Sequence, residues 1–255
     1  MSTIDLNSDL AEGFGAYKCG DDDAMLAIVT SANVACGFHA GDPEIMAHVF
    51  KTAKARGVAV GAHPGFPDLW GFGRRRIPFT VGEIERIVAY QVGAAQALAA
   101  YAGHRISYVK THGALGNMAE ADRAVADAVS RAVRAVDPSL GLMTIALSEQ
   151  AKSAEAANIE GIAEIYADRG YDDQGRMIPR GRPGAMITDP HAAAARVLAM
   201  VEAGALITHA GAKIKTPIRS VCVHSDSPEA VETAKRVRAS LEKAGLTIVP
   251  VFPVQ

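Results

Sequence analysis

Eight short apolar runs alternate along the chain with stretches of helical periodicity, and this alternation most constrains the fold. The runs are Ile4–Asn7, Asn33–Phe38, Val58–Ala62, Ile106–Lys110, Leu142–Leu147, Gly161–Tyr166, Arg219–Val223 and Thr247–Val251. Because a helix between two strands returns the chain to the end of the sheet where the first strand began, such runs pair in parallel. The pattern predicts a parallel sheet covered by helices.

Helix starts are marked by capping patterns. Asp42 and Asp189 each precede a proline, which suits the first turn of a helix. Thr80 and Glu83 have the spacing of a capping box. A chain of 255 residues with eight such units matches the size of one closed (β/α) barrel. We therefore expect a single closed (β/α) barrel domain over residues 1–255; a doubly wound open sheet is the alternative.

Composition excludes several classes of function. The formal charge is −2 with both signs interspersed, which gives no electrostatic basis for binding nucleic acid or an anionic membrane. No apolar run approaches the roughly 18 residues of a membrane span. The three cysteines, Cys19, Cys36 and Cys222, do not form a disulfide framework, and no signal peptide is visible. We expect a cytoplasmic protein.

Titratable residues gather where the predicted strands end. Because the carboxyl ends of parallel strands all lie at the same end of a barrel, these side chains are expected to share a site there. In the first strand, period-two alternation also places Asn7 and Asp9 on the same face. The strand-end candidates are Asp9, His39, His63, Lys110, His112 and His224.

Aspartate and histidine from several strands suit either of two kinds of chemistry. They bind divalent metals, and they also form metal-free acid–base pairs. No His-x-x-x-His or Cys-x-x-Cys spacing decides between them. If a metal is bound, the expected ligands are Asp9, His39 and His63. His48 and His104 are expected at the surface.

Two loops after predicted strands are rich in charge and glycine. Gly71–Arg76 contains Arg74 and Arg75, which suit a carboxylate or phosphate ligand. The long segment Ala167–Thr188 contains Asp168, Arg169 and Arg180. Long irregular segments in compact domains are often lids, so we expect it to cover the mouth; a static loop packed on the rim is the alternative.

Seven blocks of sequence resemble the LamB/YcsF family, in the family's order and over nearly the whole chain. The longest runs Asn-Val-Ala-Cys-Gly-Phe-His-Ala-Gly-Asp-Pro. The blocks are Asp5–Asp9, Asn33–Pro43, Gly61–Gly65, Gly71–Arg75, Val109–Lys110 with His112–Leu115, Ala167–Tyr171, and Val221–His224.

The resemblance implies a distorted TIM-like barrel of seven or eight parallel strands, related to the glycoside hydrolase/deacetylase group. It implies action as the A subunit of a 5-oxoprolinase, which works with subunits B and C and couples ATP hydrolysis, with Mg²⁺, to opening of 5-oxo-L-proline to L-glutamate. For that reaction the catalytic candidates are Asp9, His39, His63, Lys110 and His112. The substrate-binding candidates are Asn7, Arg74, Arg75, Asp168, Arg169 and His224.

The chain departs from the family pattern at a few positions. Thr111 stands where the family has proline, Gly116 where it has tyrosine, and Ala11 and Ser225 where it has glycine. Loss of the aromatic ring at Gly116 widens that part of the mouth. Two other functions remain open: a metal-dependent deacetylase of an N-acetyl carbohydrate, and a non-catalytic binding subunit of a multi-subunit hydrolase.

Overall fold

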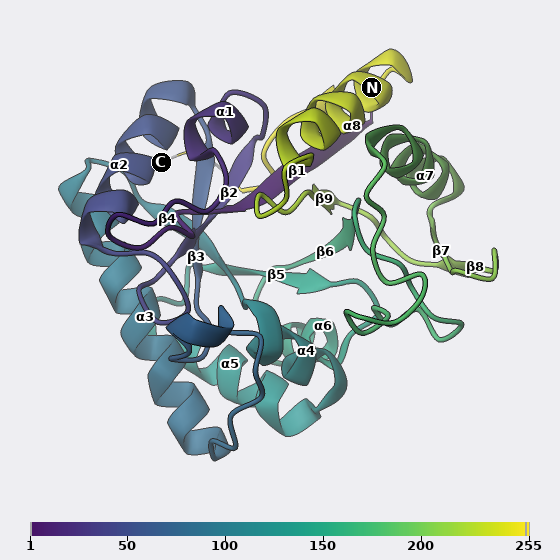
Figure 1. The fold of residues 1–255 in the computed structure, drawn as a ribbon. Coiled ribbons are helices and arrows are strands. Elements are labelled where there is room, and N and C mark those ends of the chain that lie inside the picture. Colours follow the sequence, from purple (N-terminus) through teal and green to yellow (C-terminus); the bar gives the residue numbers. More distant parts are fainter. Residues whose placement is uncertain (1, 253, 255) are drawn as a thin grey trace.

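Among the described residues, seven parallel strands close into a barrel (Figure 1). The computed structural model describes residues 2–252 and 254. In barrel order the strands are β1 (Thr3–Leu10), β2 (Ser31–Ala35), β3 (Ala59–His63), β4 (Ile106–Lys110), β5 (Gly141–Ile145), β6 (Gly161–Tyr166) and β9 (Ser220–Cys222), and β9 pairs back onto β1. The predicted (β/α) barrel is therefore confirmed, with seven strands, and the open sheet is excluded.

The eighth predicted strand exists but does not close the barrel. It is reduced to β10 (Thr247–Ile248), which pairs with Thr3 and Ile4 at the start of β1. Closure comes instead from β9, whose Ser220 lies opposite Asp5. The longest strand, β1, thus pairs with β9 and β10 in its first half and with β2 in its second half.

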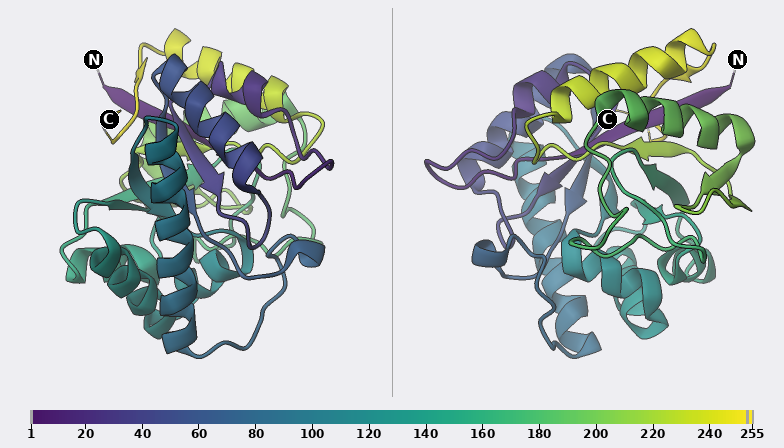
Figure 2. Two further views of the ribbon diagram at one scale, coloured as in Figure 1. Left: turned by 90° about the vertical axis from the view of Figure 1, so that its left-hand side faces the viewer. Right: turned by 45° about the vertical axis from the view of Figure 1, so that its right-hand side comes forward.

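Helices cover the outside of the barrel (Figure 2). Their starts confirm the predicted caps: Asp42 and Asp189 accept hydrogen bonds from first-turn amides, and Thr80 forms a capping box with Glu83. The helices are α1 (Asp22–Leu26), α2 (Pro43–Arg56), α3 (Val81–Tyr101), α4 (Gly113–Ala121), α5 (Arg123–Val136), α6 (Glu149–Ala156), α7 (Pro190–Ala203) and α8 (Ala230–Lys243).

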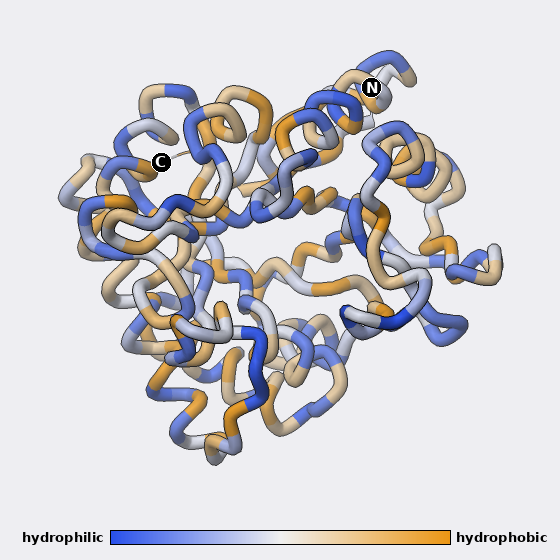
Figure 3. The backbone as a smooth tube through the Cα atoms, in the orientation of Figure 1, coloured by the Kyte–Doolittle hydropathy of each residue, from blue (hydrophilic) through white to orange (hydrophobic). Residues whose placement is uncertain are grey.

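The apolar core lies between the strands and the helices. Apolar and hydrophilic residues alternate along the helices in Figure 3, as expected of helices with one buried face. Val88, Val92 and Ala95 of α3 and Val129 of α5 are fully buried there. The inside of the barrel is different, because β1 directs Asp5, Asn7 and Asp9 into it, and all three are buried.

The chain between β6 and α7 is irregular but anchored. Arg169 pairs with Met186, and Tyr171 pairs with Met177, in isolated bridges. Tyr171 is fully buried, so the base of the segment is packed against the barrel. A short antiparallel hairpin, β7 (Ala205–Ile207) and β8 (Lys213–Lys215), follows α7 and was not expected. Within the described chain, no helix has the length and apolarity needed to span a membrane.

Candidate functional site

A cavity of about 580 Å³ opens at the mouth formed by the carboxyl ends of the strands. Its floor comes from residues at or just after strand ends, and its rim is basic. The floor includes Asp9, His63, Lys110, His112, Tyr166 and His224; the rim includes Arg74, Arg169, Arg176 and Arg180, together with Glu120 and Asp172.

Lys110 is the central cation of the floor. Its Nζ lies 3.0 Å from Asp9 Oδ1, 3.1 Å from Glu164 Oε2 and 3.2 Å from Asn7 Oδ1. Burial alone would lower the pKa of Lys110, but the carboxylates of Asp9 and Glu164, with the nearby Cys222, raise it well above its usual value. Lys110 is therefore charged and held in place by these three contacts inside the mouth of the barrel.

Asp9 carries the negative charge that faces the cavity. Its Oδ1 accepts from Asn33 Nδ2 at 2.8 Å as well as from Lys110. Its Oδ2 faces His63 Nε2 at 3.4 Å and His224 Nε2 at 3.7 Å. Burial alone would raise the pKa of Asp9, yet the neighbouring His63 and Lys110 hold it well below its usual value.

A layer of polar side chains lies beneath this pair, inside the barrel. Asn7 donates to Glu164 and to Ser220, and it accepts from Asn33 and Lys110. Asn7, expected to contact substrate, is fully buried and does not line the cavity. Its position indicates that it orients Lys110 instead.

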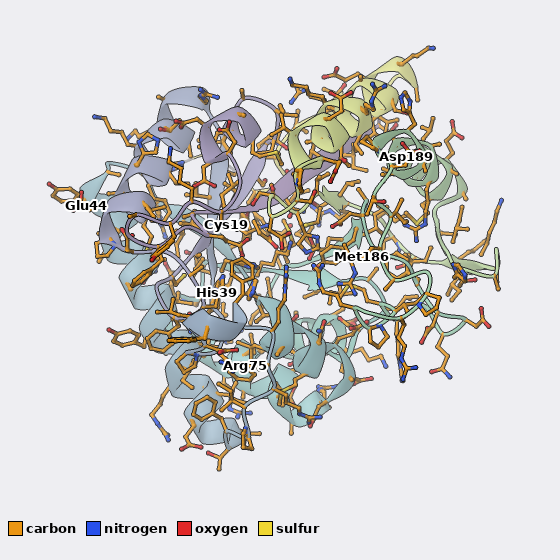
Figure 4. All side chains as sticks on the ribbon, in the orientation of Figure 1. Cys19, His39, Glu44, Arg75, Met186 and Asp189 are labelled. Carbon is orange, nitrogen blue, oxygen red and sulfur yellow. The ribbon has the colours of Figure 1, made fainter. Side chains whose placement is uncertain are left out.

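Three histidines and Glu12 form a second buried group beside Asp9. His39 Nε2 and His112 Nδ1 each lie 3.2 Å from Glu12 Oε1, and His112 Nδ1 lies 3.1 Å from His63 Nε2. Burial, together with the adjacent His112, lowers the pKa of His39 to about 3, so His39 is neutral. His39, labelled to the left of the centre of Figure 4, is buried.

His224 is oriented by Asp168 across the mouth. Its Nδ1 lies 2.7 Å from Asp168 Oδ2, and its ring stacks on Tyr166. Burial lowers the pKa of His224, but the Asp168 carboxylate outweighs this and raises it. His224 Nε2, turned toward Asp9, is thus available for proton transfer in the cavity.

The two arginines of the glycine-flanked loop diverge. Arg74 lines the cavity and pairs with Asp226 at 2.6 Å. Arg75, labelled in Figure 4, pairs with Asp68, and its side chain is 67 % exposed outside the cavity lining. In an irregular loop, residue spacing does not predict which side chains point into a cavity. Sequence alone therefore could not show that Arg74 lines the cavity and Arg75 does not.

Arg169 and Arg180 have different environments in the long segment. The Arg169 guanidinium donates to the carbonyl oxygens of Ala185 and Ile178, so it ties the segment together as well as lining the cavity. Arg180 lines the cavity, and its one hydrogen bond recorded among the described residues goes to Met186 Sδ. Burial, with Arg74 and Arg169 nearby, lowers the pKa of Arg180.

Several site residues were missed by sequence reasoning. Glu164 and Tyr166 share one face of β6, so the alternation that identified Asn7 and Asp9 would also have found them. Glu12 follows Ala11, whose φ of +58° turns the chain after β1, and no periodicity predicts that turn. Glu120, on α4, gave no signal beyond its charge.

Side chains that could bind a metal ion form two clusters in the structure, and the three ligands expected from the sequence are divided between them. One group contains Glu12, His39, His63 and His112, whose ligand atoms all lie within 4.8 Å of one another. The other contains Asp9, Cys222 and His224. Asp9 and His63 are nevertheless close, whereas His39 is directed at Glu12.

Known proteins resemble the chain over its whole length. The model of the LamB/YcsF family matches residues 4–255. The 5-oxoprolinase A subunit from Azorhizobium caulinodans is 64% identical over 99% of this chain and 100% of its own length, and the one from Gluconobacter oxydans is 56% identical over 96% and 97%. The crystal structure of a lactam utilization protein from Thermus thermophilus superposes with a TM-score of 0.91 at 41% identity, covering 97% of this chain and 99% of that one.

Proposed function

The chain belongs to the LamB/YcsF family, and from that premise we propose that it is the A subunit of a 5-oxoprolinase, which opens 5-oxo-L-proline to L-glutamate. The observation that carries the proposal is the cavity itself, where Asp9, held ionised by Lys110, faces His224 beneath a rim of arginines. Relatives that bear this name match the chain from end to end.

The cavity suits a small cyclic amide that carries a carboxylate. Its volume of about 580 Å³ falls in the usual range for small-molecule sites. Arginine recognises carboxylates through paired N–H donors. Arg74, which pairs with Asp226, and Arg180 both line the rim, where their N–H groups can bind the substrate carboxylate and orient the ring toward the floor.

Opening the ring needs attack of water at the carbonyl carbon and a proton on the departing nitrogen. Asp9, ionised at neutral pH, positions and deprotonates the water. His224, whose pKa is raised by Asp168, donates the proton to nitrogen. Lys110 balances the negative charge that develops at the floor.

ATP enters because a five-membered lactam is an unstrained, resonance-stabilised amide. Transfer of the γ-phosphoryl group of ATP to the lactam oxygen releases ADP and makes the carbon electrophilic. Water then adds to that carbon, the C–N bond breaks as the nitrogen takes a proton, and an acyl phosphate forms. A second water hydrolyses the acyl phosphate to glutamate and inorganic phosphate. We propose that this step, with Mg²⁺, takes place in an assembly with subunits B and C. The basic rim of this chain then holds both the carboxylate and the phosphoryl group.

A reconstitution assay tests the proposal. The chain, mixed with candidate B and C subunits, is expected to release glutamate from 5-oxoproline only when ATP is present. Asp9→Asn is expected to lower kcat by about 10²–10⁴-fold. Asp173→Asn, an exposed change, serves as the matched control, and size-exclusion chromatography verifies that each variant still assembles.

Two outcomes would reject the proposal. Full activity of the assembled Asp9→Asn and His224→Gln enzymes would make this chain a binding subunit without chemistry of its own. Release of acetate from an N-acetyl carbohydrate, without release of glutamate from 5-oxoproline, would favour the deacetylase alternative.

A further inference from the structure

Buried acceptor atoms converge on one point between β1 and the loops after β3 and β4. Glu12 Oε1 and His63 Nε2 lie 3.2 Å and 3.1 Å from His112 Nδ1. Asp9 Oδ2 lies 3.4 Å from His63 Nε2. All four side chains are at most 4 % exposed, so bulk water does not screen their charges. Among the described residues, Lys110 Nζ pairs with Asp9 Oδ1, whereas no lysine or arginine pairs with Glu12, so the Glu12 carboxylate and the two imidazole nitrogens suit a bound cation.

The backbone fixes which imidazole nitrogens face this point as acceptors. His63 Nδ1 lies 2.7 Å from the carbonyl oxygen of Lys110, and only an N–H satisfies a carbonyl. His112 Nε2 lies 2.8 Å from the carbonyl oxygen of Phe72 in the same way. In their neutral forms, both histidines therefore direct a lone pair at the other nitrogen. Metal-binding histidines show this pattern, in which the nitrogen away from the metal donates to a carbonyl or carboxylate.

Ring orientation selects the ligands among the three histidines. The His63 and His112 rings are nearly perpendicular, at 87°, so both lone pairs can meet at one ion. His39 lies flat against His112, with ring centroids 3.6 Å apart and planes within 5°. An ion in the plane of the His112 ring would lie well out of the plane of the His39 ring. His39 donates from Nε2 to Glu12 Oε1 and positions that carboxylate instead.

We infer that Glu12, His63 and His112 bind one divalent transition metal of the zinc class at the edge of the cavity. Two imidazoles and a carboxylate are a donor set that zinc favours. Bonds of about 2.0–2.1 Å to a tetrahedral ion place neighbouring ligand atoms about 3.3 Å apart, close to the separations observed here. His63 and His112 both line the cavity, and Asp9 lies beside His63, so a metal bound there would supply Lewis acidity next to the base.

The test uses the untagged chain alone, stripped with a chelator and dialysed. Titration with Zn²⁺ in a calorimeter is expected to show one saturable equivalent with micromolar or tighter affinity. Co²⁺ is expected to bind with visible absorption bands of a nitrogen- and oxygen-ligated site. Glu12→Gln, which keeps the shape of the side chain and removes its charge, is expected to weaken Zn²⁺ binding by on the order of 100-fold.

Two further variants sharpen the test. His39→Gln removes the group that orients Glu12, together with its stacking on His112, and is expected to weaken binding about 10-fold, the low end for outer-shell partners. His48→Gln, which removes an exposed histidine paired with Asp23, is expected to leave Zn²⁺ affinity unchanged. Circular dichroism verifies that each variant is folded, and a misfolded Glu12→Gln is replaced by His112→Gln.

Two results would overturn the inference. A folded chain that binds neither Zn²⁺ nor Co²⁺ would leave a proton shared between His63 and His112 as the positive charge. Binding that is equally tight in the wild-type chain, Glu12→Gln and His112→Gln would place any ion elsewhere. Because binding is measured without partners or ATP, failure of the 5-oxoproline assay leaves this inference standing, and the reverse also holds.

Discussion

The ammonium nitrogen of Lys110 lies 3.0 Å from Oδ1 of Asp9, and both side chains are buried at the mouth of the barrel. Glu164 shares the same ammonium from the opposite side at 3.1 Å. One cation thus serves two buried carboxylates. The ammonium of Lys110 offsets the free energy of burying both carboxylates, and it helps to keep Asp9 ionised.

Replacing Lys110 with methionine is expected to lower the free energy of unfolding by about 3–5 kcal/mol, because it removes the ammonium that Asp9 and Glu164 share in the interior. Chemical denaturation at neutral pH measures the change. The matched control is Lys152→Met, which breaks an exposed pair with Glu149 and is expected to cost under about 1 kcal/mol. If Lys110→Met lost no more free energy of unfolding than the control, Lys110 would not be neutralising the carboxylates of Asp9 and Glu164.

The neighbouring arginines Arg74 and Arg75 make a matched pair, since each is bound to an aspartate but only Arg74 lines the cavity. Arg74→Gln is expected to weaken binding of 5-oxoproline by about ten- to hundredfold, as loss of a charged hydrogen bond costs about 1.5–3 kcal/mol. Arg75→Gln is expected to change affinity by less than about threefold. Calorimetry measures the affinity of each variant for 5-oxoproline. An equal loss of affinity in both variants would argue against carboxylate binding by Arg74.

Much of the architecture follows from the order of residues in the chain. The strands and helix caps are readable because apolar periodicity and capping chemistry are local. The pairing of strands, in contrast, is not local. β9 rather than β10 completes the barrel: β9 pairs with residues 5–7 of β1, whereas β10 pairs only with residues 3 and 4. His104 illustrates the same limit, because it lies in a loop yet is buried, with Nε2 3.0 Å from the carbonyl oxygen of Val58.

The candidate site divides along similar lines. Strand-end residues such as Asp9 and His63 could be predicted, because parallel strands deliver their ends to one mouth. Glu12 could not, because it depends on a residue in the left-handed conformation at Ala11. Arg75 was expected at the site and lies outside it, because the direction of a loop side chain is set by tertiary contacts, here with Asp68.

The Asp168–His224 pair makes the pH dependence of the reaction predictable. His224 donates its proton, so activity falls as pH rises through its pKa, which Asp168 raises. Asp168→Asn removes that anion and is expected to move the alkaline limb of the kcat/KM profile to lower pH. Asp173→Asn is the control and should leave the limb in place. A limb that does not move in Asp168→Asn would exclude His224 as the proton donor.

Gly73 brings the loop Gly71–Arg76 against the stacked rings of His39 and His112, here called the histidine stack. Its φ is +62°, and a Cβ there would lie 2.6 Å from His39 Cβ and 2.8 Å from His112 Cδ2. Gly211 has a φ of +88° with nothing within 4 Å, so alanine there meets only the backbone cost of about 1–2 kcal/mol. Gly73→Ala is expected to add about 1–3 kcal/mol of overpacking to that cost and to displace the stack.

The comparison of these two alanine variants separates a purely conformational role of Gly73 from one in shaping the site. Thermal unfolding and Zn²⁺ titration are measured on both. Gly211→Ala is expected to lose stability while binding Zn²⁺ normally, whereas Gly73→Ala loses more stability and binds Zn²⁺ more weakly, because His112 is both stack member and ligand. If the two variants lose the same stability, Gly73 is required only for its backbone conformation, and the close approach of the loop to the histidines does not shape the site.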